Sequence, residues 1–275
     1  MNDANAPPVS WRIVGAIGRV FRRASATAIL LGFIVATVAF AGIAAAGMPR
    51  VGLALMVASV ACALPFLWAG WSIAKLAGRL EDAVDRWDAD EIERVHRALD
   101  GDGPPVSALD RELRKIGRAE ELLVRERYEE ARRVYASIEH DLVPTYSRPG
   151  LLGGQAYATA LAGHADAALA LARRALDEAM KLGDAYSEAK LWTQQARHGV
   201  VLSLADRHDE ALAEIGPLLD DKLRPSLYTS AAYHYARSLD VLGEHERARG
   251  WLENVAELGG PWAARARSEL AAAGA

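Results

Sequence analysis

The sequence predicts an all-α protein in which a two-helix transmembrane hairpin precedes an α-solenoid of about four helix pairs and a capping helix. Three observations predict this fold. Two long uncharged apolar stretches stand near the amino terminus, apolar residues then recur at three- to four-residue spacing, and methyl-sized residues return at nearly regular intervals. We expect four segments, which are 1–23, 24–73, 74–106 and 107–275.

The composition of the 275-residue chain changes after the second apolar stretch. Residues 1–73 contain five Arg, no Lys and one acid, Asp3, whereas residues 74–275 contain 27 bases and 35 acids. Because phosphate groups are bound by basic surfaces, this acidic part is a poor candidate for nucleic-acid binding. The single cysteine, Cys62, excludes disulfide scaffolds and cysteine-based metal sites.

Residues 24–73 predict the transmembrane hairpin. Residues 24–46 and 51–73 carry no charge, and each stretch exceeds the roughly 20 residues that a helix needs to cross a bilayer. The link between them is so short that the two helices must run antiparallel. A cleaved signal peptide, with residues 44–46 as the cleavage site, is the alternative. It is disfavoured because the apolar stretch is long for a signal and a second span follows at once.

Charged residues that flank the spans predict their orientation. Four Arg precede the first span, Lys75 and Arg79 follow the second, and the link carries only Arg50. Positive side chains favour the cytoplasmic side, and the Ala- and Arg-rich composition suits a bacterial source. We therefore expect the hairpin in the inner membrane, with both termini and the domain after it cytoplasmic. Neither span contains an acid, a base or a His, so the hairpin is expected to be an anchor rather than a transport path.

Residues 74–106 predict an amphipathic connector helix followed by a linker. Large apolar side chains recur at helical spacing, at Leu76, Leu80, Val84, Trp87, Val95 and Leu99. The opposite face is rich in acids, which argues against contact with anionic lipid. The Gly and Pro residues of 100–105 predict the end of this helix, and Ser107 with Asp110 resembles a capping box that starts the next one.

Four stretches of residues 107–275 align with one another. They are 126–138, 163–175, 206–218 and 243–255, and the sixth residue of each is Ala. Another small residue stands twelve positions before each of these alanines. The eight predicted packing positions are Ala119, Ala131, Ala156, Ala168, Gly199, Ala211, Ala236 and Ala248. Because a larger side chain would overpack a close helix crossing, this pattern predicts pairs of closely crossing helices.

This arrangement resembles the tetratricopeptide repeat over about residues 108–260. The matching features are the small crossing residues, a late Pro in three units, and a Gly or polar residue at the turn, here Glu126, Gly163, Asp206 and Gly243. The constant alanines are 37, 43 and 37 residues apart, against about 34 in the family, and the family's early Trp is absent. The resemblance implies stacked antiparallel helix pairs, which residues 261–275 would cap.

The resemblance also implies a concave groove that is lined by the first helix of each pair and binds a protein or peptide. Carrying the family's pattern over indicates six groove positions, which are Tyr157, Thr193, Val200, Tyr233, Arg237 and Asp240. Tyr and Arg are common in binding hot spots. Intramolecular packing is the alternative role, above all for Tyr157 and Tyr233.

The sequence shows no recognisable catalytic or metal site. His164, His208 and His245 stand at equivalent turns, which stacked helices would hold roughly 10 Å apart, too far to share a metal ion. The GLLGG stretch at 150–154 lacks the Lys and Ser/Thr of a phosphate loop, so we expect it to be a loop and a helix start. We therefore expect no enzyme activity and no cofactor.

Two functions remain as hypotheses. The first is a membrane-anchored scaffold or adaptor that binds a protein or peptide partner at the cytoplasmic face of the inner membrane. The second is a self-assembling, membrane-associated structural component whose main partner is another copy of itself. A measurement of particle size in detergent distinguishes them, because a monomer removes the second.

Overall fold

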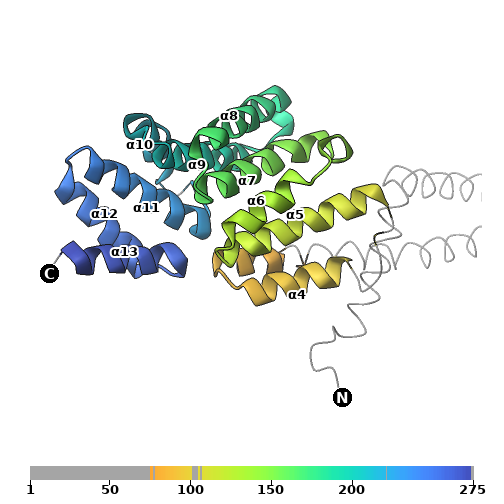
Figure 1. The fold of residues 1–275 in the computed structure, drawn as a ribbon, viewed down its shortest axis with the longest axis horizontal. Coiled ribbons are helices and arrows are strands. Elements are labelled where there is room, and N and C mark those ends of the chain that lie inside the picture. Colours follow the sequence, from red (N-terminus) through yellow and green to blue (C-terminus); the bar gives the residue numbers. More distant parts are fainter. Residues whose placement is uncertain (1–74, 77, 101–104, 106, 221, 274–275) are drawn as a thin grey trace, which may run out of the picture. The chain divides into compact units, whose positions relative to one another are not determined.

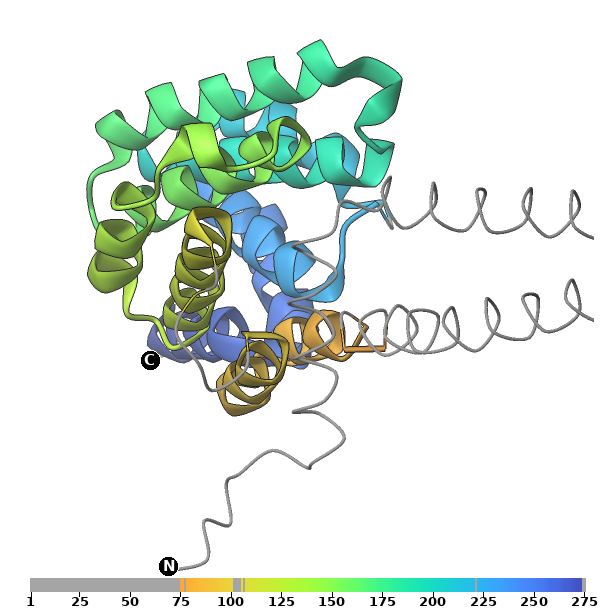
Figure 2. The same ribbon diagram turned by 90° about the vertical axis from the view of Figure 1, so that its right-hand side faces the viewer.

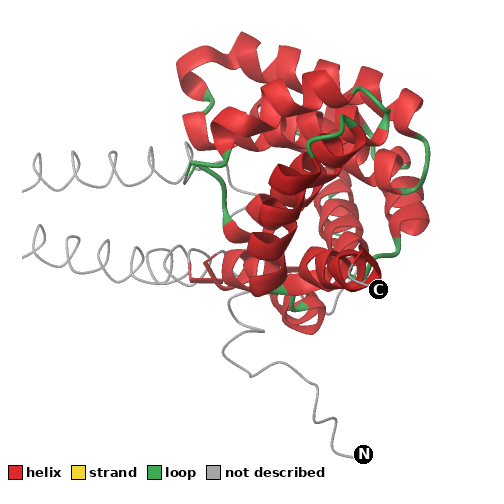
Figure 3. Ribbon diagram, turned by 90° about the vertical axis from the view of Figure 1, so that its left-hand side faces the viewer, coloured by secondary structure: helices red, strands yellow, loops and turns green. Residues whose placement is uncertain are grey.

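The computed structural model describes residues 75, 76, 78–100, 105, 107–220 and 222–273. The regular elements in these residues are helices, and no strand occurs among them (Figure 3). The predicted all-α fold is thus confirmed for this part of the chain. The predicted amino-terminal segment and transmembrane hairpin, residues 1–73, lie outside the described residues. Within the described ranges, no helix combines the length and the apolar character that crossing a bilayer requires.

The described residues fall into two compact units. Residues within 75–81 and 94–105 belong to the first, in which Leu76, Val95 and Ala98 form a small apolar cluster with Leu80. Residues 82–93 and those from 107 to 273 belong to the second, which we call the repeat unit. The repeat unit carries most of the described chain.

Between residues 107 and 273 the repeat unit consists of helix pairs and one final helix (Figure 1). The pairs are α5 (Ala108–Val124) with α6 (Tyr128–Ala136), α7 (Arg148–Leu161) with α8 (Ala165–Leu182), α9 (Glu188–Leu204) with α10 (His208–Ile215), and α11 (Pro225–Val241) with α12 (His245–Glu257). The final helix is α13 (Gly260–Ala273). Short 3-10 segments lie in three of the links, at His140–Leu142, Thr145–Ser147, Gly183–Ala185 and Gly216–Leu218. The predicted cap of α5 is confirmed, because Ser107 Oγ accepts the N–H of Asp110 at 3.0 Å.

The helices pack in a regular order. The two helices of each pair contact each other, and each second helix contacts the first helix of the next pair. The first helices also contact one another in series, from α5 through α7, α9 and α11 to α13. The last helix also reaches the first of these pairs, because Arg265 on α13 donates to Glu126 at the turn after α5 at 2.6 Å; Figure 2 gives a second view of these helices.

Each pair turns in the same way. The turn residue has a left-handed backbone, with φ of 57° at Glu126, 87° at Gly163, 57° at Asp206 and 84° at Gly243. At every turn the N–H of the next residue bonds to a carbonyl oxygen five residues earlier, at 2.9–3.0 Å. This geometry satisfies carbonyl groups that the end of a helix leaves without partners. It explains why Gly, Glu or Asp stands at the turn, and not a β-branched residue.

The same turn occurs once more, at Trp87. Residues 78–85 are helical, Trp87 has a φ of 57°, and the N–H of Asp88 bonds to the carbonyl oxygen of Ala83 at 2.9 Å. Asp88 then caps α4 (Ala89–Asp100) by accepting the N–H of Glu91 at 2.9 Å. The prediction of one continuous connector helix is therefore wrong, because capping at Asp88 starts a second helix. We call residues 82–93, which belong to the repeat unit, the hairpin tip. They are distinct from the predicted transmembrane hairpin of residues 24–73.

Candidate functional site

The eight predicted packing positions all lie in the interior of the repeat unit. Their seven alanines are at most 1% exposed, and Gly199 is buried on α9. A Cβ built on Gly199 would lie 2.5 Å from Cγ1 of Ile215 on α10. No side chain fits at that point unless a neighbour moves. These positions bring helices together and offer no surface to a partner.

The glycine-rich stretch at 150–154 lies entirely within α7, so the prediction of a loop there is wrong. Pro149 stands in the first turn of α7, where its missing N–H costs no hydrogen bond and its fixed φ favours the helix. A Cβ on Gly154 would lie 2.6 Å from the hydroxyl oxygen of Tyr135 on α6. The stretch therefore permits close helix contact and forms no phosphate loop.

Three of the six predicted groove residues serve the interior. Val200 is fully buried and Tyr233 is 5% exposed. Tyr157 on α7 shares a 2.7 Å hydrogen bond with Ser230 on α11, two pairs further along the chain. Burial raises the pKa of Tyr157, which keeps its hydroxyl protonated. Val200 is consequently corrected from a groove residue to a core residue, since no partner can touch it.

The final helix, α13, covers the predicted groove position Tyr233. Trp262 on α13 is 1% exposed, and its ring centroid lies 5.1 Å from that of Tyr233 and 4.9 Å from that of His234. The guanidinium carbon of Arg265 lies 4.5 Å from the Trp262 ring centroid. Burial lowers the pKa of His234 to about 3, so this imidazole is neutral at physiological pH. Residues 261–275 were predicted only to cap the repeats, and the role of Trp262 in the core was not predicted. The one indication in the sequence is that Trp262 is a single large aromatic residue among small ones.

The other three predicted groove residues keep some exposure but already have partners. Arg237 donates to Glu269 Oε1 at 3.0 Å, and Asp240 Oδ1 lies 2.8 Å from Nδ1 of His245. Thr193 donates to the carbonyl oxygen of Ala189 in its own helix at 2.9 Å. The structure thus does not bring the six residues together on one open surface.

The carboxyl-terminal end of α11 combines exposed apolar and charged side chains. Val241 is 57% and Leu242 is 40% exposed, which is high for residues of this size. In the two preceding pairs Leu161 and Leu204, which stand two residues before the turn as Val241 does, are partly buried against the core. We call Arg237, Asp240, Val241 and Leu242 the α11 patch. It contains two predicted groove residues and an apolar pair that sequence analysis missed.

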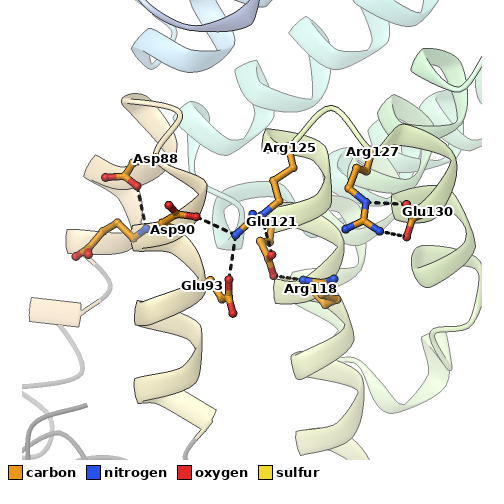
Figure 4. Close-up of polar contacts among 9 residues, drawn as sticks. Asp88, Asp90, Glu93, Arg118, Glu121, Arg125, Arg127 and Glu130 are labelled. Carbon is orange, nitrogen blue, oxygen red and sulfur yellow. Dashed lines mark hydrogen bonds and ion pairs between the residues drawn. The ribbon is translucent and has the colours of Figure 1, made fainter. Parts of the chain in front are cut away.

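One arginine side chain at the end of α5, that of Arg125, ties the hairpin tip to this helix (Figure 4). Arg125 donates to Asp90 Oδ1 at 3.1 Å and to Glu93 Oε2 at 2.9 Å. Its Nε also pairs with Glu121 at 3.0 Å, and Glu121 accepts from Arg118 at 2.5 Å. The charges in this network satisfy one another, so it holds helices together rather than forming a ligand site.

A buried carboxylate joins α5 to the link that follows α6. Glu112, whose side chain is fully buried, accepts from Arg111 and Lys115 at 2.8 Å and from the N–H of Glu139 at 3.0 Å. Burial alone would raise the pKa of Glu112. The hydrogen bonds from Lys115, the Glu139 amide and Arg111 outweigh burial and hold the pKa at about 2. Glu112 is therefore a charged structural link.

One group of side chains resembles the catalytic triad of hydrolases. Ser238 Oγ lies 3.2 Å from Nδ1 of His208, and Nε2 of His208 lies 3.8 Å from Oδ1 of Asp206. Ser238 is fully buried and donates to Ser203 Oγ at 3.0 Å. A nucleophile must meet its substrate, so this serine cannot act as one. Among the described residues, no group of three or more His, Cys, Asp or Glu side chains is placed to hold a metal ion.

Comparison of the chain with protein families, with characterised proteins and with solved structures gives no match.

Proposed function

We propose that this chain is a membrane-anchored, tetratricopeptide-like scaffold that binds a protein or peptide partner at the cytoplasmic face of the inner membrane. Repeated turns, methyl-sized crossing residues and serial packing of the first helices are all features of α-solenoids, which function mainly by binding other chains. The uncharged stretches 24–46 and 51–73 and the basic residues beside them support the anchor and its orientation.

The observation that carries this proposal is the α11 patch. Exposed apolar side chains rimmed by polar ones are typical of interaction surfaces, and Arg is enriched among the residues that supply most of the binding energy. Arg237 and Asp240, with side chains 48% and 54% exposed, can add charge-based selectivity at the edge of this pair. The patch replaces the continuous groove as the proposed partner surface, because α13 fills the inner side beside it.

End-to-end self-assembly is less well supported. The exposed side chains of α13 within residues 260–273 are small or polar, namely Ala264, Arg267, Ser268, Ala271, Ala272 and Ala273. A further copy stacked on this helix would bury little apolar surface, and stable interfaces need an apolar centre. This observation favours a scaffold over an array of stacked repeat units.

Photo-crosslinking in cells tests the proposal. A photoreactive residue replaces Val241 in the full chain. A matched control replaces Arg249, whose side chain is 74% exposed on α12 and pairs with Glu253 of the same helix. We expect a covalent adduct with another protein from position 241, none from position 249, and the chain itself in the membrane fraction.

Three outcomes would overturn parts of the proposal. Equal labelling from both positions, or none from 241, removes the α11 patch as the partner surface. A chain recovered only in the soluble fraction removes the anchor. An adduct of twice the chain mass supports self-association in place of a separate partner.

A further inference from the structure

The hairpin tip contacts the start of α11 through the carboxylate of Asp85. Asp85 Oδ2 accepts from Nη2 and Nε of Arg224 at 2.7 and 3.3 Å, and Oδ1 accepts from Ser226 Oγ at 2.9 Å. Arg224 and Ser226 stand at the amino-terminal end of α11, a 17-residue helix whose dipole also favours a negative group there. Both carboxylate oxygens of Asp85 are therefore recognised.

The second contact is aromatic. The Trp87 ring lies against the backbone of Gly260 at the start of α13, so closely that a Cβ on Gly260 would overlap it. Trp87 also packs against the apolar cluster that contains Trp262. Trp87 has a φ of 57°, a conformation that is unfavourable for a bulky residue. This strained conformation of Trp87 places its indole ring against α13.

The ion pair between Asp85 and Arg224 is accessible to solvent, although other tip residues are firmly held: Ala83 and Ile92 are fully buried, and Arg125 binds Asp90 and Glu93. The side chains of Arg224 and Asp85 are 45% and 20% exposed, so water and competing carboxylates can reach the ion pair. The chain on both sides of the tip, up to residue 81 and from residue 94, belongs to the other compact unit. Within the tip, Asp85 contacts α11 and Trp87, two residues later, contacts α13.

We propose that Arg224, Ser226 and Gly260 form a binding site for an acidic–aromatic segment, and that Asp85 and Trp87 occupy it as a tethered ligand. A partner with the same chemistry, a carboxylate followed two residues later by an aromatic ring, binds there by displacing the tip. The tether gives the tip a high effective concentration, so the site discriminates against weak, freely diffusing segments. This inference deepens the proposed scaffold function and rests on it, but it concerns a different surface from the α11 patch.

A labelled peptide with the sequence of residues 82–93, DAVDRWDADEIE, is the probe. Its binding to the full chain in detergent is followed by fluorescence anisotropy. In the double variant Asp85→Ala/Trp87→Gly the tip loses both contacts, while Gly keeps the left-handed turn without strain. We expect this variant to bind the peptide at least tenfold more tightly than the wild type does.

Two controls define the site. Arg86→Ala changes the exposed residue between the two contacts and should bind the peptide as weakly as the wild type. Adding Arg224→Ala to the double variant should abolish the gain, and so should replacing the Asp85 and Trp87 equivalents of the peptide with Ala. The single, more conservative variant Asp85→Asn, with an expected severalfold gain, serves if the double variant does not fold.

Equal affinity of the wild type and the released variants, or no binding of the peptide at about 1 mM, overturns the inference. Equal binding of the Ala-substituted peptide does so as well. Because the probe is part of this chain, these results do not depend on any partner. Crosslinking from Val241 with no gain in peptide binding would leave the scaffold function intact and remove only the tethered-ligand site.

Discussion

Arg265 on α13 donates a hydrogen bond of 2.6 Å to the carboxylate of Glu126, which lies 139 residues earlier, at the turn between α5 and α6. The same guanidinium group stacks on Trp262 and reaches the hydroxyl of Tyr128 at 3.2 Å. This contact joins the last helix to the first pair after residue 107. Together with buried Trp262, it holds α13 against the inner side of the repeat unit.

Arg265→Ala should lower the free energy of unfolding by about 1–2 kcal/mol, mainly through the lost stacking on Trp262. Glu126→Gln should cost less than about 1 kcal/mol, because the ion pair is about 40% exposed on both sides and water screens it. Urea unfolding of the full chain in detergent measures both values. Arg249→Ala, whose ion pair lies within one exposed helix, is the control and should be nearly neutral. An equal loss for Arg265→Ala and Arg249→Ala would show that closure contributes nothing.

The left-handed turns predict opposite effects for two substitutions. Asp206 adopts a φ of 57° and its side chain is 96% exposed, so Asp206→Gly should stabilise the fold by about 0.5–1 kcal/mol. Gly163 has a φ of 87°, and Gly163→Ala should destabilise it by about 1 kcal/mol. Thermal unfolding of the two variants side by side tests this pair. The same sign for both would contradict the assignment of equivalent turns.

The close crossing at Gly199 predicts a strong effect of a single methyl group. Gly199→Ala places a Cβ against Ile215 and should cost about 1–3 kcal/mol, despite the higher helix propensity of Ala. Gly250→Ala on α12 is the matched control, because nothing lies within 4 Å of a Cβ there, and it should stabilise the helix by about 1 kcal/mol. Combining Gly199→Ala with Ile215→Ala should cost less than the sum of the single changes. If the changes in the free energy of unfolding are strictly additive, there is no steric conflict between the new methyl group at position 199 and Ile215.

His234 predicts a loss of stability in mild acid. Burial lowers the pKa of His234 to about 3, whereas this side chain has the ordinary pKa near 6.5 in the unfolded chain. Between about pH 6.5 and 3 the imidazole is therefore protonated in the unfolded state and neutral in the folded state, and this difference favours unfolding. This stabilising contribution is complete above pH 6.5 and is lost as the pH falls from 6.5 toward 3. His234→Phe keeps an aromatic ring beside Trp262 and should reduce the pH dependence by up to about 1.4 kcal/mol per pH unit in that window. Urea unfolding at pH 7, 6 and 5 gives the slopes, and identical slopes for the variant and the wild type would refute the assignment.

The candidate site was only partly predictable from the sequence. Repeated small residues indicated the helix crossings, because methyl-sized side chains at fixed spacing are a local requirement of close packing. The turn at Trp87 escaped prediction, because a tryptophan is not a turn signal and only capping at Asp88 reveals the second helix. The groove prediction treated Val200 as an open position and left Tyr233 open between the groove and the core, whereas both are covered in the folded chain. Nothing in the local pattern distinguishes Leu204, which is partly buried, from Val241, which is exposed.

The sequence by itself determined the helical character of the chain after residue 74, the small residues at the crossings and the four turns that join the pairs from α5 to α12. These features depend on periodicity, on helix capping and on the backbone freedom of Gly, Asp and Glu, which act over a few residues. Only the tertiary structure decided which face of the repeat unit stays open. That outcome depends on contacts between residues more than 100 positions apart, Arg265 with Glu126 and Asp85 with Arg224, which no local sequence pattern encodes.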